Sequence, residues 1–341
     1  MSYDRRPPET VGQLCELARA VVVRGGRVVA LTDFDDTVST TVGDGTDPFA
    51  TDFDTHAGHA LAAIQAHGQV VGILSNRAAG QITERCARVG FAHAPYVVGT
   101  YGYELLSPMG TPRIDRLFSP HREAITRLLG VARRTLLRVC GAGDDDPPTI
   151  EATIETVQGP VYVEVKGASA EYPEGLAQEY NFNRIVPAIR TRVVAALERS
   201  IRLARAREDV GQMRALSQLW GDERMGDSAA PGRFSWALKP TLARGKAYGL
   251  VRVLRAIGAE SGELGDRCLV VYAGDHRRQD GQVMWAGKAL ERLSRGQALF
   301  AGVWAYPGWD SPGAPDESDL RVDGVQGVAD TLTALAATVA R

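Results

Sequence analysis

The sequence predicts a two-domain α/β protein: a doubly wound, Rossmann-like parallel sheet interrupted by an inserted α+β domain. Three observations predict it. Apolar runs of strand length alternate with segments of helical spacing in both terminal parts of the chain, which favours a parallel sheet covered by helices. The middle part has a different texture and begins at a proline- and glycine-rich connection. The length of 341 residues exceeds the ~250–300 at which a single core stops growing.

The first apolar run, over residues 28–32, follows a segment of helical spacing over 10–23 and is predicted to be a strand buried on both faces. It ends in the carboxylates Asp33, Asp35 and Asp36. Asp33 and Asp35 point to the same side of an extended chain, and their mutual repulsion favours a bound cation. Because ligands of open α/β sheets bind at the carboxyl ends of strands, we predict a functional site here. A capped strand end, where Asp and Thr satisfy a turn, is the alternative interpretation.

Two later apolar runs, over 69–74 and 267–273, end in polar residues in the same way. The residues that follow them are Ser75, Asn76 and Arg77 after the first run and Gly274, Asp275 and His276 after the second. Between the two runs, a basic segment over 239–246 stands at the entry to a helical pattern. The other elements expected in this part of the chain are helices over 59–67 and 77–89 and a short strand over 96–98.

Residues 106–234 are predicted to form the inserted domain, and residues 1–105 together with 235–341 the core. The elements expected in the insert are a helix over 122–138, a hairpin of 149–157 with 161–165, a helix over 184–220 and a loop over 221–232, after which a strand over 234–238 returns to the core. The long helix has one apolar face and one arginine face, and we interpret the arginine face as solvated surface. The acidic triplet at 144–146 is interpreted as a solvated loop.

Composition sets the expected class of protein. A hydrophobic content of 44% and a charged content of 23% are ordinary for a soluble globular protein. The formal net charge of −2 gives no reason to propose nucleic acid or an anionic membrane as a partner. Cys15, Cys86, Cys140 and Cys268 lack the spacing of a zinc site or a disulfide frame, which indicates a reducing compartment. Neither a signal peptide nor the ~18–20 apolar residues of a membrane helix is found, so a cytoplasmic location is expected.

An acid, a hydroxyl, a basic residue and a second acid follow successive apolar runs in this order. That order resembles the haloacid dehalogenase (HAD) superfamily of phosphatases. The resemblance implies that Asp33 attacks phosphorus and that Asp35 acts as the general acid. It also implies that Ser75 holds the phosphoryl group and that Arg244 or Lys246 neutralises its charge.

Mg²⁺ is the cofactor that the resemblance implies. Its protein ligands are expected to be the Asp33 carboxylate, the Asp35 backbone carbonyl and Asp275, with waters completing an octahedron. Asp280 is expected to support this metal site from outside. Capping of the following helix is the alternative role for Asp280.

Within the superfamily, the chain is similar to the trehalose-6-phosphate phosphatases. The segments that carry the similarity are Asp33-Phe34-Asp35-Asp36-Thr37, Ser75-Asn76-Arg77, Gly99-Thr100-Tyr101-Gly102-Tyr103-Glu104, Glu164-Val165-Lys166-Gly167 and Leu238-Lys239-Pro240 with Arg244-Gly245. The resemblance implies that Asn76, Arg77, Glu104, Glu164 and Lys166 contact the substrate. Glu164 and Lys166 also lie two residues apart on an expected strand and so share a face. An exposed ion pair worth ~0–1 kcal/mol is the alternative interpretation of these two residues.

The chain departs from this family at several motif positions. Residues 274–280 keep only the first and last acids of the family's Gly-Asp-Asp-x-Thr-Asp-Glu, with Gln279 in the place of an Asp. Arg244 replaces a Lys, and Tyr101 replaces a His. These changes favour a relative such as the phosphatases of pseudo-disaccharide biosynthesis, for example those acting on validoxylamine A 7′-phosphate.

The sequence therefore predicts a Mg²⁺-dependent phosphatase whose partner is a small phosphorylated sugar or sugar-like compound. Two alternatives remain open. One is a phosphomutase or phosphotransferase on the same fold, in which a substrate hydroxyl takes the place of water. The other is a binding or regulatory protein without activity, which His276 and Gln279 suggest.

Overall fold

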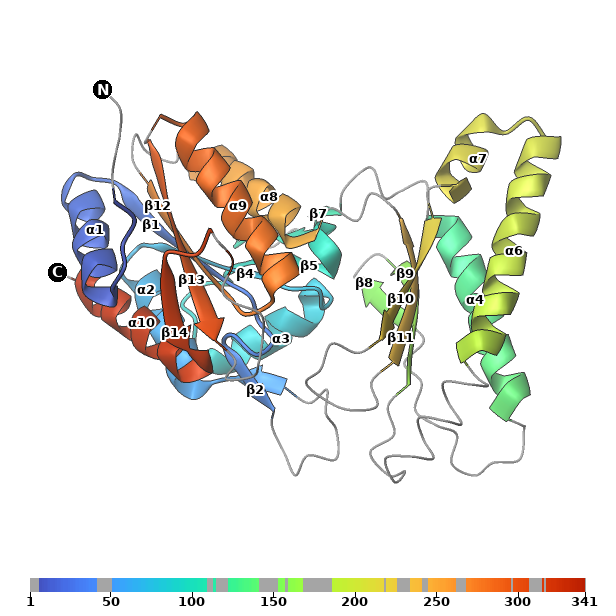
Figure 1. The fold of residues 1–341 in the computed structure, drawn as a ribbon, viewed down its shortest axis with the longest axis horizontal. Coiled ribbons are helices and arrows are strands. Elements are labelled where there is room, and N and C mark those ends of the chain that lie inside the picture. The colour runs from blue at the N-terminus through green and yellow to red at the C-terminus, as the bar shows by residue number, and fades with distance from the viewer. Residues whose placement is uncertain are drawn as a thin grey trace. The chain divides into compact units, whose positions relative to one another are not determined.

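The computed structural model of the protein describes most of the chain. The described residues are 6–41, 51–108, 113–114, 122–140, 153–156, 159–167, 186–217, 219–225, 234–240, 245–261, 268–295, 297–306, 315 and 317–340. The chain divides into two compact units (Figure 1). The first unit comprises Met1–Arg113 and Arg244–Arg341, and the second comprises Ile114–Ala243.

Within the described residues, the first unit is built on an eight-stranded sheet. The strand order is β14 (Leu320–Asp323), β13 (Ala298–Tyr306), β12 (Cys268–Gly274), β1 (Arg27–Thr32), β4 (Val70–Leu74), β5 (Tyr96–Gly99), β6 (Glu104–Leu106) and β7 (Arg113–Ile114). Neighbouring strands from β14 to β5 pair in parallel, and β6 pairs antiparallel to β5. The predicted doubly wound parallel sheet is therefore confirmed, with an antiparallel addition at one edge.

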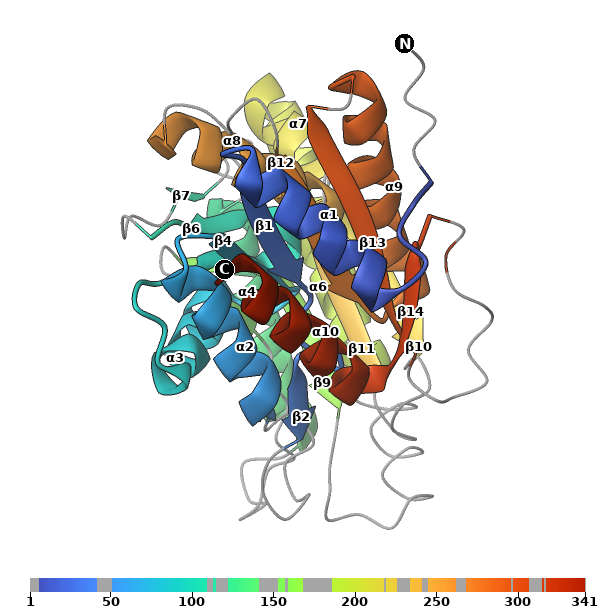
Figure 2. The same ribbon diagram turned by 90° about the vertical axis from the view of Figure 1, so that its left-hand side faces the viewer.

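Helices cover both faces of this sheet. The helices on one face are α1 (Val11–Val23), α2 (Thr55–Ala66), α3 (Ala79–Val89) and α10 (Gly324–Val339), and Figure 2 shows α1, α2 and α10 from that side. The other face is covered by α8 (Gly245–Ser261) and α9 (Arg277–Leu293). Alternate residues of β1 supply both cores: Val28 and Ala30 pack on the first side, and Val29 and Leu31 on the second. Such two-sided burial explains why this strand reads as a continuous apolar run.

Two short strands, β2 (Ser39–Thr41) and β3 (Thr51–Phe53), pair antiparallel beside the end of β1. Helix α2 follows β3 and begins at Thr55, earlier than the expected residue 59. The cause is Asp54, whose carboxylate accepts the backbone N–H groups of His56 and Ala57 and so caps the helix.

The second unit has α+β architecture. Its described strands form a four-stranded antiparallel sheet in the order β10 (Leu219–Met225), β11 (Phe234–Pro240), β9 (Gly159–Gly167) and β8 (Thr153–Thr156). Its described helices are α4 (Arg122–Cys140), α6 (Val186–Ala206) and α7 (Val210–Ser217). The expected hairpin is present as β8 and β9, with a register shift between Ile154 and Glu155.

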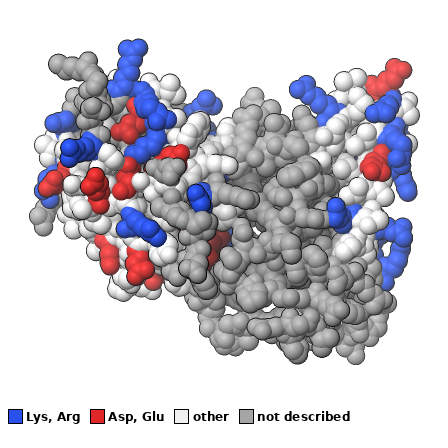
Figure 3. All heavy atoms as spheres, in the orientation of Figure 1, with Lys and Arg blue, Asp and Glu red and all other residues white. Residues whose placement is uncertain are grey.

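Helix α6 is amphipathic in the way that its sequence predicts. Ile189, Val193 and Leu197 are buried, whereas the arginines of the opposite face are exposed. Figure 3 shows Lys and Arg side chains along the outer surface of the described helices in this unit. Arg202 lies 3.9 Å from Glu198 one turn earlier, an exposed pair of the kind that contributes little stability.

Three boundaries in the second unit differ from the prediction. The helix expected over 184–220 is two helices, because Glu208 adopts a left-handed φ of 54° and Asp209 caps α7 by accepting the Gln212 N–H. The loop expected over 221–232 is wrong for its first residues, which belong to β10. The strand expected to return to the core is β11, which pairs with β9 and β10 in the second unit. Along the chain, the borders between the two units lie at 113/114 and 243/244, whereas the sequence analysis places them at 105/106 and 234/235.

Among the described residues, Cys15, Cys86 and Cys268 carry free thiols. None of the described helices is both long enough and apolar enough to cross a lipid bilayer.

Candidate functional site

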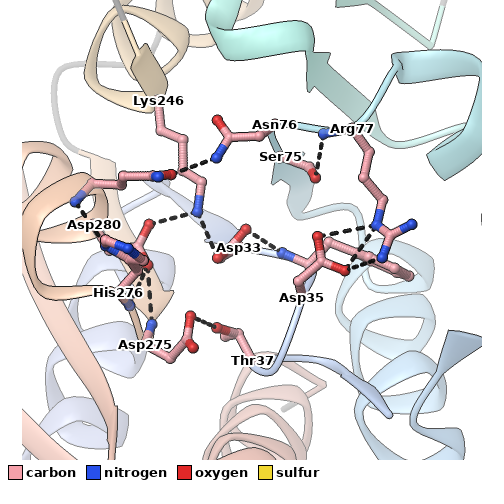
Figure 4. A network of polar contacts seen from close by, with 12 residues as sticks. Asp33, Asp35, Thr37, Ser75, Asn76, Arg77, Lys246, Asp275, His276 and Asp280 are labelled. Carbon is pink, nitrogen blue, oxygen red and sulfur yellow. Dashed lines mark hydrogen bonds and ion pairs between the residues drawn. The ribbon is translucent and has the colours of Figure 1, made fainter. Parts of the chain in front are cut away.

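The candidate site lies where β1, β4 and β12 end side by side. Thr32 at the end of β1 is in register with Ile73 of β4 and Ala273 of β12. The polar residues that follow each strand are therefore brought together, as Figure 4 shows for Asp33, Ser75 and Asp275. The Asp33 backbone N–H donates to the Ala273 carbonyl over 2.8 Å, which continues the β1–β12 ladder up to the site.

Asp33 forms a buried ion pair with Lys246. The Lys246 Nζ lies 2.5 Å from Asp33 Oδ2, and the other Asp33 oxygen accepts the Phe34 N–H over 2.6 Å. Burial raises the pKa of Asp33 well above its usual range, and the Lys246 charge opposes that rise. Burial alone would lower the pKa of Lys246, but Asp280 and Asp33 together raise it above its usual value. Lys246 is therefore a fixed positive charge beside the Asp33 carboxylate.

The position of Lys246 comes from the start of α8. Gly245, the first residue of the helix, has a φ of 62°, a left-handed conformation that glycine adopts without the steric cost of a side chain. Lys246 follows in the first turn and is only 3% exposed. Of the two cations expected to neutralise phosphate, Lys246 is thus found at Asp33, and Arg244 lies outside the described residues.

Asp280 is saturated with hydrogen bonds. Its Oδ1 accepts from Lys246 Nζ at 2.9 Å and from the Tyr272 hydroxyl at 2.7 Å. Its Oδ2 accepts the backbone N–H groups of Asp275 and His276, at 3.0 and 2.8 Å. Asp280 therefore both fixes Lys246 and caps the segment that leads into α9. Burial, followed by the Asp280 charge, raises the pKa of Tyr272, which keeps that hydroxyl a donor.

Asp275 completes a cluster of acids that could hold a metal ion. Carboxylate oxygens of Asp33, Asp275 and Asp280 all lie within 4.8 Å of one another. The Thr37 hydroxyl donates to Asp275 Oδ1 over 3.2 Å. Burial, and then repulsion from Asp280, raises the pKa of Asp275 to about 7. Three carboxylates with one lysine leave an excess of negative charge and offer the oxygen ligands that Mg²⁺ prefers, so the residues fit a divalent cation.

Asp35 is not one of the three clustered acids, and its carboxylate pairs with Arg77. The Arg77 Nε lies 2.8 and 3.0 Å from the two Asp35 oxygens, and its Nη2 lies 2.6 Å from Oδ1. Such a two-oxygen contact fixes the plane of the carboxylate. Ser75 lies on the same loop as Arg77, and its Oγ accepts the Arg77 backbone N–H over 3.1 Å. The structure thus places Ser75 at the site and Arg77 directly on Asp35.

Asn76, a predicted substrate contact, is hydrogen-bonded to Gln279. The Asn76 amide Nδ2 donates to Gln279 Oε1 over 2.5 Å and so joins the loop after β4 to the first turn of α9. The Asn76 Oδ1 is buried and accepts no hydrogen bond within the described residues. His276 caps α9 by accepting the Gln279 N–H at its Nδ1. His276 and Gln279 therefore have structural partners in this chain.

The remaining predicted residues are Glu104 of the first unit and Glu164 and Lys166 of the second. Glu104 is 1% exposed, and its carboxylate accepts the Ala79 N–H and the Thr100 hydroxyl, each over 2.8 Å. Glu164 and Lys166 lie on β9 of the second unit, in register with Ala237 and Ser235 of β11, and their side chains are outside the described part of the structure.

Sequence reasoning missed two residues of the site, Tyr272 and Thr37. In the sequence, Tyr272 is indistinguishable from the other buried residues of β12. Only its position two residues before Gly274 indicates that its hydroxyl could contact the site. Thr37 lies two residues after Asp35, so the sequence indicates that it is close to these acids. Its hydrogen bond to Asp275 could not be predicted from the sequence.

Comparison with known proteins gives a likeness of fold. No protein-family model and no curated protein sequence matches the chain. Among solved structures, the C-terminal domain of trehalose-6-phosphate phosphatase from C. albicans matches with a TM-score of 0.57 and 12% identity over 98% of this chain and 99% of that one. The C-terminal domain of the Candida albicans trehalose synthase regulatory protein matches with a TM-score of 0.52 and 9% identity over 97% and 99%. A trehalose-6-phosphate phosphatase related protein matches with 0.51 and 13% over 91% and 97%.

The chain has the fold of the trehalose-6-phosphate phosphatases. The expected resemblance to the trehalose-6-phosphate phosphatases is therefore confirmed at the level of fold. The resemblance to the validoxylamine branch stays a prediction, as does the role of the second unit in substrate specificity.

Proposed function

We propose that the protein is a Mg²⁺-dependent phosphatase of a phosphorylated sugar or sugar-like monoester, such as trehalose 6-phosphate or validoxylamine A 7′-phosphate. The observation that carries the proposal is the Asp33–Lys246–Asp280 chain of buried charges at the carboxyl end of β1. A carboxylate buried against a lysine, next to further acids, is a costly arrangement that a folded protein keeps where chemistry needs it. The shared fold is consistent with this reaction class.

In the first step, an Asp33 carboxylate oxygen attacks phosphorus and the bond from phosphorus to the ester oxygen breaks. Asp35, which is protonated before this step, gives its proton to that oxygen, which leaves as an alcohol, and an aspartyl-phosphate remains. In the second step, water gives a proton to Asp35 and attacks phosphorus. The bond to Asp33 breaks, inorganic phosphate is released and both carboxyl groups return to their starting states.

The surrounding residues oppose the charge that this reaction concentrates. Phosphate monoesters hydrolyse so slowly that enzymes accelerate the reaction by up to ~10²¹-fold, and electrostatic stabilisation is the main means. Lys246 favours the ionised form of Asp33 and neutralises the phosphoryl group, with Arg244 a further candidate. Ser75 positions that group. Mg²⁺ held by Asp33, the Asp35 carbonyl and Asp275, with Asp280 behind them, would neutralise the phosphoryl oxygens.

Substrate recognition belongs to the second unit in this proposal. The first unit is proposed to bind the phosphoryl group, which all sugar phosphates share. Discrimination among sugars therefore needs contacts with the rest of the substrate, which the second unit would supply. Glu164 and Lys166 lie two residues apart on β9 and are proposed to contact the sugar, and Asn76 and Arg77 of the first unit are proposed to contact the phosphate ester.

A regulatory or binding function is the second candidate. Gln279, which stands where the family has Asp, is bonded to Asn76, so this position supplies no acid to the metal site. One of the solved structures with the same fold is described as a regulatory protein. A catalytic test separates the two functions.

The test is phosphate release from a panel of phosphorylated sugars that includes trehalose 6-phosphate and validoxylamine A 7′-phosphate, with Mg²⁺ or with a chelator. We expect Mg²⁺-dependent release from at least one compound and none from the Asp33→Asn variant. Transfer of phosphate to an added sugar without release would instead identify a phosphotransferase. Binding of a panel compound without turnover would favour the regulatory function.

A further inference from the structure

Glu104 is a buried carboxylate with a specific pair of partners. It lies at the start of β6, and Oε2 accepts both the Ala79 N–H and the Thr100 hydroxyl over 2.8 Å. Helix α3 begins at Ala79, and its N-cap residue Ala78 supplies no side-chain hydrogen bond. Glu104 therefore caps α3 from another strand, and its negative charge lies at the positive end of the helix. Glu104 is 1% exposed, and both of these contacts are made within the first unit.

Thr100 links Glu104 to the backbone of Arg77. Its N–H donates to the Arg77 carbonyl over 2.7 Å. Thr100 is fully buried and has a φ of 50°, a conformation that is costly for a β-branched residue and persists only when its surroundings enforce it. The preceding Gly99 has no room for a side chain, because a Cβ there would lie 2.7 Å from the same Arg77 carbonyl oxygen. We call Thr100 and Glu104 with these contacts the Thr100–Glu104 brace.

The brace is anchored on its other side by α8. The Arg252 guanidinium donates to the carbonyls of Gly102 and Tyr103 at 2.9 and 2.6 Å. The turn between Thr100 and Glu104 is thus held to the helix that carries Lys246.

Arg77 in turn holds Asp35. The Asp35 side chain is 38% exposed and that of Arg77 is 20% exposed. Because the Arg77 guanidinium contacts both Asp35 oxygens, the orientation of the Asp35 carboxylate depends on where the Arg77 side chain lies, and so on the position of the Arg77 backbone. That backbone is fixed by Ser75 Oγ on its N–H and by Thr100 on its carbonyl.

We propose that Glu104 is a positioning residue that, through Thr100 and Arg77, holds Asp35 where it delivers a proton to the leaving oxygen. This inference rests on the proposed phosphatase function and assigns Glu104 a role different from the substrate contact that the sequence suggests. Proton delivery by a general acid is worth about 10²–10⁴-fold in rate, and it matters most when the leaving group is poor.

The test compares two small aryl esters that need no recognition of a sugar, phenyl phosphate and 4-nitrophenyl phosphate, in the presence of Mg²⁺. Phenolate is the poorer leaving group. We expect Glu104→Gln to lower kcat for phenyl phosphate by about 10- to 100-fold and to lower it clearly less for 4-nitrophenyl phosphate. KM should change by less than about threefold for both esters, because no substrate contact is removed. Thr100→Val should act in the same direction, and Thr100→Ser, which keeps the hydroxyl, should restore most of the rate.

The matched control is Asp319→Asn. Asp319 is also a buried carboxylate, 3% exposed, and it accepts the Gly302 N–H and a Lys288 contact on the far strands of the same sheet. We expect this variant to lower the melting temperature but to leave the ratio of the two esters unchanged. Equal losses on both esters for Glu104→Gln, or a rise in KM with kcat unchanged, would overturn the positioning role. Absence of turnover of either ester by the wild type would overturn the proposed function, and the inference with it.

Discussion

Lys246 offsets part of the negative charge of the candidate site. Its single ammonium group contacts the carboxylates of Asp33 and Asp280, which are 5% and 0% exposed. Removing one partner of a buried ion pair leaves uncompensated charge, which costs more than the pair itself contributes. In the proposed mechanism, the same group favours the ionised form of Asp33, which attacks phosphorus. Lys246 therefore has both a structural and a catalytic role in the proposed function.

Lys246→Met is expected to reduce phosphate release by at least about 10²-fold and to lower the free energy of unfolding by about 3–5 kcal/mol. Turnover of 4-nitrophenyl phosphate and urea denaturation measure the two effects. Lys288→Met is the control, because Lys288 pairs with Asp319 and Glu291 away from the acid cluster. That control should lose stability and keep turnover. A Lys246→Met enzyme that retained wild-type turnover would show that this cation is not needed.

Asp275 makes metal affinity depend on pH. Its pKa in the metal-free fold is raised to about 7, whereas its ordinary value is 3.8, so the folded state holds a proton that the unfolded state releases between these values. This contribution to stability is present below about pH 4 and is lost as the pH rises through about 7. Mg²⁺ needs the ionised carboxylate and competes with that proton.

We therefore expect the apparent Mg²⁺ affinity to rise with pH, by up to about tenfold per pH unit below about pH 7, and to level off above it. Calorimetric titration of the wild type between about pH 5.5 and about pH 8.5 measures this. Asp275→Asn should bind Mg²⁺ weakly and show little of this dependence. Equal affinities across the range in the wild type would contradict the assignment of Asp275 as a ligand.

The segment that joins β12 to α9 is the element on which the acid cluster depends. A side-chain carbon at Gly274 would lie 2.5 Å from the Asp280 Cγ, closer than real contacts allow. Gly274 is thus required by the tight return of Asp280 onto the backbone of Asp275 and His276. The capping contacts at the start of α9 and the candidate metal site therefore depend on this one turn.

Gly274→Ala is expected to destabilise the fold by about 1–3 kcal/mol and to weaken Mg²⁺ binding, because Asp280 must move. Gly258→Ala in α8 is the control. A Cβ at Gly258 meets nothing within 4 Å, so that variant should be stabilised by about 0.4–1 kcal/mol. Urea denaturation of both variants measures the difference, and equal effects at the two positions would contradict this account of Gly274.

At the level of elements, the central parallel strands of the first unit could be predicted from the sequence, because each is an apolar run that ends in polar residues. Thr32 to Asp33 and Leu74 to Ser75 are such transitions. The second unit was harder, because β10 contains Gly221, Asp222 and Glu223 and so lacks strand periodicity. The contact between Asn76 and Gln279 joins residues 203 positions apart, and nothing local in either segment indicates it.

At the scale of the whole molecule, the chain combines a unit built on a mostly parallel sheet with a unit of different architecture inserted between its two halves. The sequence placed the candidate site at the carboxyl ends of β1, β4 and β12, and the topology of the sheet brings these ends together. It placed the return to the first unit too early, because β11 is apolar like the core strands but pairs with β9.

The division of labour between the units gives a further prediction. Lys166→Ala is expected to raise KM for the natural sugar phosphate by about tenfold and to leave 4-nitrophenyl phosphate turnover nearly unchanged, because the aryl ester carries no sugar to recognise. Steady-state kinetics on both compounds measure this. The same change in both substrates, or in neither, would remove Lys166 from sugar recognition.

The central claim is that Asp33 carries the phosphoryl group during turnover. The direct measurement is acid quenching of the enzyme with 4-nitrophenyl phosphate and Mg²⁺, followed by mass spectrometry of its peptides. Asp35→Asn should accumulate the adduct, because the second step needs Asp35 to take a proton from water. We predict phosphate on the peptide that contains Asp33, and none in Asp33→Asn. Phosphate bound at another residue, or full turnover by Asp33→Asn, would contradict the claim.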